Sequence, residues 1–389
     1  MIPRTISQKL LELSQKFPVI AVIGPRQSGK TTLVKHLFPE KDYLNLEEPD
    51  IRLFAAQDPR AFLANHSRGL IVDEAQQVPE LFSYIQGMVD ANPEPGHFVL
   101  TGSQHFLLHE KISQSLAGRV AILKLLPFSL EELKSVADKS LPFQEYIYRG
   151  FFPPIYDREI HPPDWFANYI PTYIERDVRS LKNITDLTTF ATFLKLCAGR
   201  VGHLLNLTSL ANELGVTTNT VRAWLSVLEA SFVVFRVSPF YRNFNKRLVK
   251  MPKLYFYDTG LACYLLGIRE VDQLNYHFLK GELFENLILS EVMKFYLNRG
   301  EEPLIYFWRD KSGREIDCLI DRGGTLKALE IKVSQTISGE FFKNLAYWQT
   351  LSGSSPEDSY LIYGGDQTQN RSIARVHPWH DLPEVLATF

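Results

Sequence analysis

A glycine-rich segment near the N-terminus has the residue types and spacing of a phosphate-binding loop. The segment GPRQSGKT (24–31) fits the pattern G-x-x-x-x-G-K-[ST] without a mismatch. In such a loop backbone N–H groups converge on phosphate oxygens, Lys30 neutralises β/γ charge and the Thr31 hydroxyl faces Mg²⁺. The alternative is a chance glycine-rich turn. The residues expected to hold a nucleotide are Gly24, Pro25, Arg26, Gln27, Ser28, Gly29, Lys30, Thr31 and Thr32.

Further polar residues follow apolar runs at places where they could complete this site. The run 69–72 delivers Asp73 and Glu74 to the end of a buried strand, where Asp73 would hold Mg²⁺ and Glu74 would orient or deprotonate a water molecule. The alternative is that these acids cap a turn. Ser103 would bring a hydroxyl to the γ-phosphate or lie in an ordinary turn. Arg119 is either a phosphate sensor or trans-acting finger, or a surface arginine.

The segments around these residues alternate between strand and helix patterns. Strands are expected at 18–24, 43–46, 69–74, 97–103 and from 121, and helices at 6–17, from 30, from 58–59 and at 79–89. This alternation predicts a parallel α/β sheet with its site at the carboxyl ends of the strands.

The middle of the chain has helical patterns and then a region with the features of a winged helix. In 207–240, two apolar helix faces are separated by a turn at Gly215, and strands from Phe232 would form the wing. Only Arg222 on the second helix could read a base or a phosphate. A winged helix that serves only as a packing module is the alternative.

A basic stretch between Glu229 and Asp258 contains no acid. Its cations alternate with aromatic residues, a pattern that suits single strands or backbone phosphates. The alternative is a solvated face whose aromatic residues belong to the core. The cations are Arg236, Arg242, Lys246, Arg247, Lys250 and Lys253, and the aromatic residues include Phe235, Phe240, Tyr241 and Phe244.

Carboxylates in the last third of the chain could hold a second metal ion. Glu285 lies on an apolar helix pattern, Asp317 on a strand pattern, and Glu330 and Lys332 on the next strand pattern. Two residues apart, Glu330 and Lys332 share one face of their strand. Acids at Asp317 and Glu330 could therefore chelate Mg²⁺ or Mn²⁺, with Glu285 beside them and Lys332 polarising a water molecule. Alternating charges on a solvated face are the alternative.

Length and composition limit the classes of protein to consider. The 389 residues predict two or three domains, here 1–140, 141–265 and 266–389. A net charge of −2 means that any nucleic-acid surface must be local. The three separated cysteines, Cys197, Cys263 and Cys318, exclude a disulfide framework or a CxxC metal cluster. No apolar run could span a bilayer and no signal peptide is visible, so we expect a cytoplasmic protein that is not bound to a membrane.

Several motifs together resemble one family. They are GPRQSGKTTL (24–33), VDEAQQVP (72–79), TGSQ (101–104), LAGRV (116–120), LPFSLEEL (126–133), RDV (176–178), YFYDTGL (255–261), GELFEN (281–286), REIDCLI (314–320) and LEIKVS (329–334). The chain resembles the predicted AAA+-type ATPases with an N-terminal P-loop AAA domain and a C-terminal domain of unknown function 4143 (DUF4143). One departure is Phe151, where the usual pattern has a glycine.

The resemblance implies an ASCE-type ATPase core, a winged-helix middle and an α+β C-terminal fold similar to the restriction-endonuclease-like PD-(D/E)xK nucleases. It also matches Glu285, Asp317, Glu330 and Lys332 to the nuclease-like pattern. We expect ATP and Mg²⁺ as cofactors, DNA or RNA as a partner, and self-association as a homo-oligomer. The alternatives to an ATPase are a nucleotide-switched regulator with little turnover and a metal-dependent nuclease gated by ATP.

Overall fold

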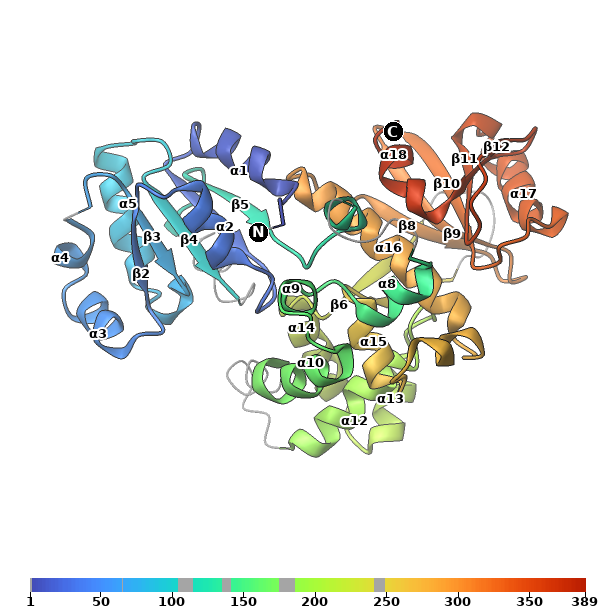
Figure 1. Ribbon diagram of the computed structural model, residues 1–389, viewed down its shortest axis with the longest axis horizontal. Helices are drawn as coiled ribbons and strands as arrows, with labels where there is room; N and C mark the ends of the chain where they lie inside the picture. The colour runs from blue at the N-terminus through green and yellow to red at the C-terminus, as the bar shows by residue number, and fades with distance from the viewer. Residues whose placement is uncertain (1, 65, 104–114, 135–140, 175–185, 241–248) are drawn as a thin grey trace. The chain divides into compact units, whose positions relative to one another are not determined.

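Short apolar segments separated by helices build the first of two units into which the chain divides (Figure 1). The computed structural model describes residues 2–64, 66–103, 115–134, 141–174, 186–240 and 249–389. The first unit is 1–128 with 228–232 and 297–301, and the second unit is the remainder of the chain. The predicted division into 1–140, 141–265 and 266–389 remains a prediction. No described helix is both long enough and apolar enough to cross a membrane.

The described part of the first unit contains a parallel sheet with the strand order β2-β3-β4-β1-β5. Its strands are β1 (Val19–Ile23), β2 (Asp42–Asn45), β3 (Leu70–Asp73), β4 (Phe98–Gly102) and β5 (Val120–Lys124). Every residue of β1, β3 and β4 is buried, which explains their continuous apolar runs. The predicted parallel α/β sheet is therefore confirmed, and β1, β3 and β4 end side by side.

One helix precedes the strands of this unit and others connect them. They are α1 (Ile6–Ser14), α2 (Lys30–Leu37), α3 (Pro49–Gln57), α4 (Pro59–Ala64) and α5 (Leu81–Ala91). Apolar residues of α1 and α2 share one core with β1, β3, β4 and β5. The sequence pattern did not predict α3, whose Leu53 and Phe54 side chains are 56% and 48% exposed and so form no inward apolar face. The helix predicted from 58–59 is α4, and Asp58 caps it, because its Oδ1 accepts a hydrogen bond from Ala61 N at 3.0 Å.

The second unit combines helices with one large sheet. Its helices are α7 (Leu130–Leu133), α8 (Phe143–Arg149), α9 (Pro153–Asp157), α10 (Pro162–Tyr169), α12 (Leu187–Ala198), α13 (Leu207–Leu214), most of α14 (Thr218–Ala230), α15 (Thr259–Leu265), most of α16 (Lys280–Asn298), α17 (Lys343–Ser352) and α18 (Leu382–Leu386). Its strands are β6 (Val234–Pro239), β7 (Lys253–Phe256), β8 (Ile305–Arg309), β9 (Glu315–Arg322), β10 (Thr325–Lys332), β11 (Ser359–Tyr363), β12 (Gln369–Asn370) and β13 (Arg375–Pro378). Single turns of 3-10 helix lie at Ala75–Gln77 in the first unit and, in the second, at Val271–Asn275, Gly339–Phe342, Pro356–Asp358 and Trp379–Asp381, with a π-helical turn at Ile170–Ile174.

The sheet of the second unit has the order β12-β13-β11-β10-β9-β8-β6-β7 among the described residues. The strands expected to form a wing, β6 and β7, pair antiparallel, and β6 also pairs with β8. These two strands therefore extend the C-terminal sheet. On the side of β9 opposite β8, strands β10, β11 and β13 run parallel to one another, so their carboxyl ends lie together.

Helix α16 is fixed to this sheet by buried polar contacts. The Asn286 amide accepts from Phe256 N at 2.7 Å and donates to Phe256 O at 2.9 Å, so it replaces a missing strand partner at the end of β7. The neighbouring side chain, Glu285, is thereby positioned over β7. At the departure from the family pattern, Phe151 N donates to Asp258 Oδ2 at 2.6 Å and Phe151 packs in the core.

Candidate functional site

The glycine-rich loop joins the end of β1 to the start of α2, as predicted. Gly29 has φ +93°, a left-handed conformation that favours glycine, and it directly precedes Lys30 at the helix start. A Cβ on Gly24 would lie 2.0 Å from the Leu125 carbonyl oxygen, so only glycine allows this close approach. The Lys30 ammonium lies 3.0 Å from Gly24 O and 2.8 Å from Pro25 O. Lys30 is therefore held inside the loop.

Hydroxyl groups from three elements surround the Asp73 carboxylate. Thr31 Oγ1 and Tyr43 OH each donate to Asp73 Oδ2 at 2.7 Å, and Thr101 Oγ1 donates to Oδ1. The structure thus brings together Thr31 and Asp73, the two residues predicted to hold Mg²⁺. Burial, and secondarily the Asp73 carboxylate, raises the pKa of Tyr43 well above its usual range. Sequence reasoning missed Tyr43 and Thr101, although both are polar residues on strands that flank β3.

Glu74 follows β3 in an unusual backbone conformation. Its φ of +54° is rare for a residue that is not glycine and indicates local strain, which commonly occurs at functional sites. Its Oε2 accepts hydrogen bonds from Ser103 Oγ at 3.0 Å and from Gln76 Nε2. Two residues that the sequence assigned separate roles, Glu74 and Ser103, therefore contact each other, and Gln76 is a third member that the sequence did not single out.

Two buried polar atoms in this region have no hydrogen-bond partner among the described residues. They are Ser28 Oγ in the loop and Gln76 Oε1 beside Glu74. Such atoms are usually satisfied by a ligand or by ordered water. Together with the converging loop and the oxygen atoms of Thr31 and Asp73, they make the site chemically suited to a nucleotide phosphate with Mg²⁺.

A buried arginine that the sequence analysis overlooked ties the loop to its surroundings. Arg4 is 7% exposed, and its guanidinium donates to Ser28 O at 2.8 Å and to Leu126 O at 2.6 Å. It also lies 4.8 Å from the centre of the Phe128 ring. The sequence signal was weak, because one arginine ahead of an amphipathic helix is common.

Arg119 forms an ion pair on the surface of the first unit. Its guanidinium donates to both carboxylate oxygens of Asp90, with NH2 at 2.9 Å from Oδ2. Both side chains are partly exposed. A role for Arg119 as a phosphate sensor or trans-acting finger remains a prediction.

Three acids of the second unit approach one another. Glu285 on α16 and Glu315 and Asp317 on β9 each offer an oxygen atom within 4.8 Å of the other two, and we call these residues the acidic cluster. Glu285 and Asp317 were predicted, whereas Glu315 was not, although it lies two residues before Asp317 on the same strand face. The Lys253 ammonium contacts Glu285 Oε1 at 2.9 Å and also contacts Glu315 Oε1.

The electrostatic surroundings of the acidic cluster shift the pKa values of its members. Burial raises the pKa of Glu285 to about 7, opposed by Lys253 and reinforced by Asp317. Burial would lower the pKa of Lys253, but the three carboxylates outweigh it and raise that pKa above its usual range. Lys253 lies in the basic stretch, but its side chain is buried and paired with acids, so it is not available to phosphates.

Glu330 makes a separate set of contacts on β10. Its Oε1 lies 2.8 Å from the Lys332 ammonium and 3.3 Å from Asn344 Nδ2, while Oε2 is buried without a partner among the described residues. Burial, and secondarily Asp317, raises the pKa of Glu330 to about 8. Lys332 also reaches Asp317 Oδ2 at 3.4 Å, and Ile331 N donates to the same oxygen at 2.7 Å. Lys332 thus connects the predicted acids Asp317 and Glu330.

The residues predicted to contact nucleic acid are only partly described. Arg222, Arg236 and Lys250 are exposed, whereas Arg242, Lys246 and Arg247 lie outside the described residues, as do Tyr241 and Phe244. Phe235 is buried and lies 5.6 Å from the Tyr255 ring, and Phe240 packs against Trp348. The described aromatic residues of the basic stretch therefore belong to the core, which is the alternative left open above.

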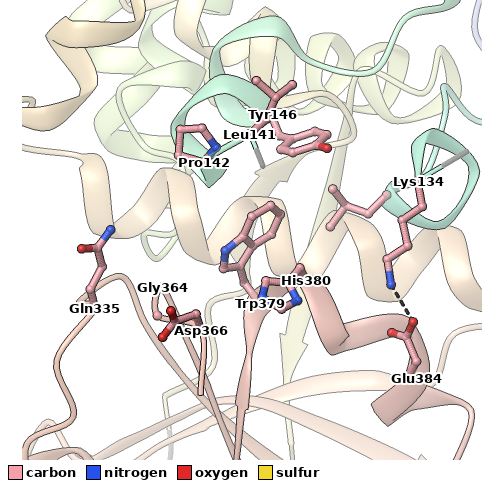
Figure 2. A pocket seen from close by; sticks show the side chains of 12 residues that line it. Lys134, Leu141, Pro142, Tyr146, Gln335, Gly364, Asp366, Trp379, His380 and Glu384 are labelled. Carbon is pink, nitrogen blue, oxygen red and sulfur yellow. Dashed lines mark hydrogen bonds and ion pairs between the residues drawn. The ribbon is translucent and has the colours of Figure 1, made fainter. Parts of the chain in front are cut away.

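A cavity of about 700 Å³ lies in the second unit, where β10, β11 and β13 end (Figure 2). Trp379 stands at its centre, Tyr146 and Pro142 come from the helical side, and Lys134 reaches Glu384 at 2.6 Å. The carboxyl ends of parallel strands are a common location for ligands. The sequence analysis predicted none of these residues.

Comparisons with known sequences divide the chain into three matching regions. Residues 16–134 match an AAA domain, residues 141–272 a domain of unknown function (DUF8612), and residues 280–382 the domain of unknown function DUF4143. The first match contains the loop together with Asp73, Glu74 and Ser103. The third contains the acidic cluster and Glu330.

Relatives along most of the chain come from several bacteria. Uncharacterised proteins of Mycobacterium tuberculosis and Mycobacterium bovis are each 31% identical over 340 residues, which is 86% of this chain and 75% of theirs. An uncharacterised protein of Haemophilus influenzae is 22% identical over 321 residues, 74% of this chain and 77% of its own.

Solved structures that match part of the chain include the Walker-type ATPase of Pyrococcus abyssi, with a TM-score of 0.47 and 16% identity over 68% of this chain and 96% of that one. The RuvB Holliday junction branch migration motor of Thermotoga maritima has a TM-score of 0.33 and 19% identity over 60% of this chain and 88% of its own. The first unit contains most of the match to the AAA domain together with the parallel sheet, so it is a P-loop ATPase-like α/β domain. On its domain matches and its mycobacterial relatives, the chain belongs to the family of proteins that carry an N-terminal AAA domain and a C-terminal DUF4143 domain.

Proposed function

We propose that this protein binds ATP with Mg²⁺ at the glycine-rich loop and hydrolyses it. The observation that carries the proposal is the meeting of Thr31 with Asp73, and of Glu74 with Ser103, at the neighbouring carboxyl ends of β3 and β4 beside the loop. A bound Mg²⁺ would neutralise phosphate charge. The residues suited to hold that ion are Thr31 and Asp73.

In this proposal each side chain has a distinct task. The loop N–H groups and Lys30 bind the β- and γ-phosphates. Glu74 takes a proton from the attacking water molecule while the new O–P bond forms and the bond from the γ-phosphorus to the β–γ bridging oxygen breaks. Ser103 and Gln76 hold the Glu74 carboxylate in place through their hydrogen bonds to Oε2.

Two variants test the proposal by separating binding from turnover. Lys30→Ala should abolish nucleotide binding, because it removes the cation inside the loop. Glu74→Gln should bind ATP normally yet lose about 10²–10⁴-fold in turnover, the usual contribution of a general base. Fluorescent-nucleotide binding and phosphate release measure the two quantities.

The outcome also separates hydrolysis from a nucleotide switch. Equal turnover in Glu74→Gln and in the wild type would contradict the assignment of Glu74. Tight ATP binding without turnover in the wild type would favour the regulator that changes state with little hydrolysis.

A second candidate function concerns the C-terminal domain. We propose that Glu285, Asp317 and Glu330, with Glu315 as an added ligand, serve a Mg²⁺ or Mn²⁺ site that cleaves nucleic acid, with Lys332 beside the reacting water molecule. The acidic cluster favours it, because three carboxylates within 4.8 Å repel one another unless cations compensate them. Oxygen ligands of this kind suit these two metals. Exposed Arg222, Arg236 and Lys250 would contact the nucleic-acid backbone.

Asp317→Ala tests this second candidate. The variant should lose Mn²⁺ binding and any strand cleavage, because it removes the acid that connects the acidic cluster to Lys332. ATP hydrolysis should survive, since its residues lie in the first unit. Calorimetric Mn²⁺ titration and a cleavage assay on labelled DNA and RNA measure the effect. Unchanged Mn²⁺ binding in Asp317→Ala would contradict this site.

A further inference from the structure

The acidic cluster contains a buried cation that belongs to the chain itself. Lys253 is 3% exposed, and its ammonium contacts Glu285 Oε1 at 2.9 Å and Glu315 Oε1 as well. From its position at the start of β7, the side chain passes the Phe307 ring of β8, with Nζ 5.6 Å from the ring centre. One ammonium thus joins acids from α16 and β9.

The position of this ammonium has an energetic consequence. Burying an unpaired ammonium is costly, and so is bringing carboxylates together without a cation. Lys253 and the acidic cluster therefore stabilise each other. A divalent ion would need carboxylate oxygens at about 2.0–2.6 Å, and the oxygens of Glu285 and Glu315 that Lys253 uses would have to turn to the metal instead. Ammonium and metal ion thus compete for the same atoms.

We propose that Lys253 is the buried cation built into the acidic cluster, and that a divalent metal ion binds the cluster tightly only when Lys253 is displaced or removed. This inference rests on the metal site proposed above and adds its regulation. Metal loading of the C-terminal domain then depends on a movement of β7 or of the Lys253 side chain. Without such a movement the Lys253 ammonium, and not a metal ion, compensates the negative charge of the carboxylates.

The experiment replaces Lys253 in the full chain and asks whether Mn²⁺ takes its place. Lys253→Met keeps an unbranched side chain and removes the charge, so its melting temperature should fall in metal-free buffer and recover when Mn²⁺ is added. The Kd for Mn²⁺ should be about tenfold lower than in the wild type, which corresponds to about 1.4 kcal/mol. Calorimetry and thermal unfolding provide the two readouts.

Two variants serve as matched controls. Lys294 is also fully buried, but it pairs with the single acid Glu291 at 2.7 Å, so Lys294→Met should lose stability that Mn²⁺ does not restore. Lys253→Arg keeps the charge and should bind Mn²⁺ as weakly as the wild type. Equal Mn²⁺ affinity in the wild type and in Lys253→Met would overturn the inference while leaving the metal site intact. Absence of Mn²⁺ binding in both would overturn the inference and the metal site together.

If Lys253→Met does not fold in metal-free buffer, refolding with and without Mn²⁺ provides the test. Recovery of the native circular dichroism spectrum only with Mn²⁺ supports the inference. Failure to recover with Mn²⁺ contradicts it, because the metal ion then does not replace the ammonium. Lys294→Met should behave identically in both buffers.

Discussion

At the scale of single residues, the acids of the two candidate sites have different surroundings. Asp73 is surrounded by the hydroxyl groups of Thr31, Tyr43 and Thr101, which donate to a carboxylate. These hydrogen bonds hold the carboxylate oxygens in place beside the loop. Glu330 is instead buried and Glu285 half-buried near other acids, and their pKa values are raised to about 8 and about 7. Their charge is therefore sensitive to pH near neutrality.

The raised pKa of Glu330 predicts how the stability of the folded protein depends on pH. Its pKa rises from 4.5 to about 8 on folding, mainly through burial, so the folded protein favours the neutral carboxyl group. The resulting stability is complete below pH 4.5 and is lost as the pH rises towards 8. Glu330→Gln should lack this decline. Urea unfolding at a series of pH values, followed by tryptophan fluorescence, measures it. Parallel pH profiles for the wild type and Glu330→Gln would contradict the assignment.

At the scale of elements, the sequence predicted most of what builds the first site. Continuous apolar runs identified β1, β3 and β4, because strands buried on both faces need apolar residues throughout. The loop pattern and the acid pair then located the site at the ends of these strands. Local patterns could not predict Tyr43 or Gln76 as members, because their role depends on contacts formed only in the folded sheet.

The members of the acidic cluster were even harder to predict from local sequence patterns. The strand pattern placed Asp317 and Glu330 on neighbouring strands, and β9 and β10 do pair. The sequence could not reveal that Lys253 lies among acids, since β7, β9 and α16 meet only through the tertiary fold. For the same reason the sequence could not show that Lys253, which lies in the basic stretch, is a buried partner of carboxylates.

Arg4, which lies just before α1, leads to a prediction about the glycine-rich loop. Arg4 joins the loop carbonyl of Ser28 to that of Leu126, so Arg4→Ala leaves two buried acceptors and should cost about 1–3 kcal/mol for each one left without a partner. The Kd for ATP should rise as the loop loosens. Arg4→Lys should recover part of both losses. Thermal unfolding and nucleotide titration measure them, with exposed Lys16→Ala as the control. Unchanged ATP affinity in Arg4→Ala would show that the guanidinium does not organise the loop.

At the scale of the whole molecule, one chain joins an ATPase-like domain to a second unit with its own candidate chemistry. The two candidate sites share no residue and lie in different units, so their activities can be measured separately. Coupling between them is then defined as a change in one activity when the ligand of the other site is added. Comparing Mn²⁺ affinity with and without ATP would measure that coupling directly.

Net charge leads to the last prediction, which concerns nucleic acid. Because the whole chain carries only −2, electrostatic binding must come from a local set of cations such as exposed Arg222, Arg236 and Lys250. Each phosphate contact contributes about −0.7 to −0.9 to the slope of log K against log salt concentration. Replacing all three cations by alanine should therefore flatten the slope by about 2–3 for labelled single strands followed by anisotropy. Exposed Lys343→Ala, whose lysine pairs with Glu340, should leave it unchanged. A slope that is identical in the triple variant and the wild type would exclude these cations from the interface.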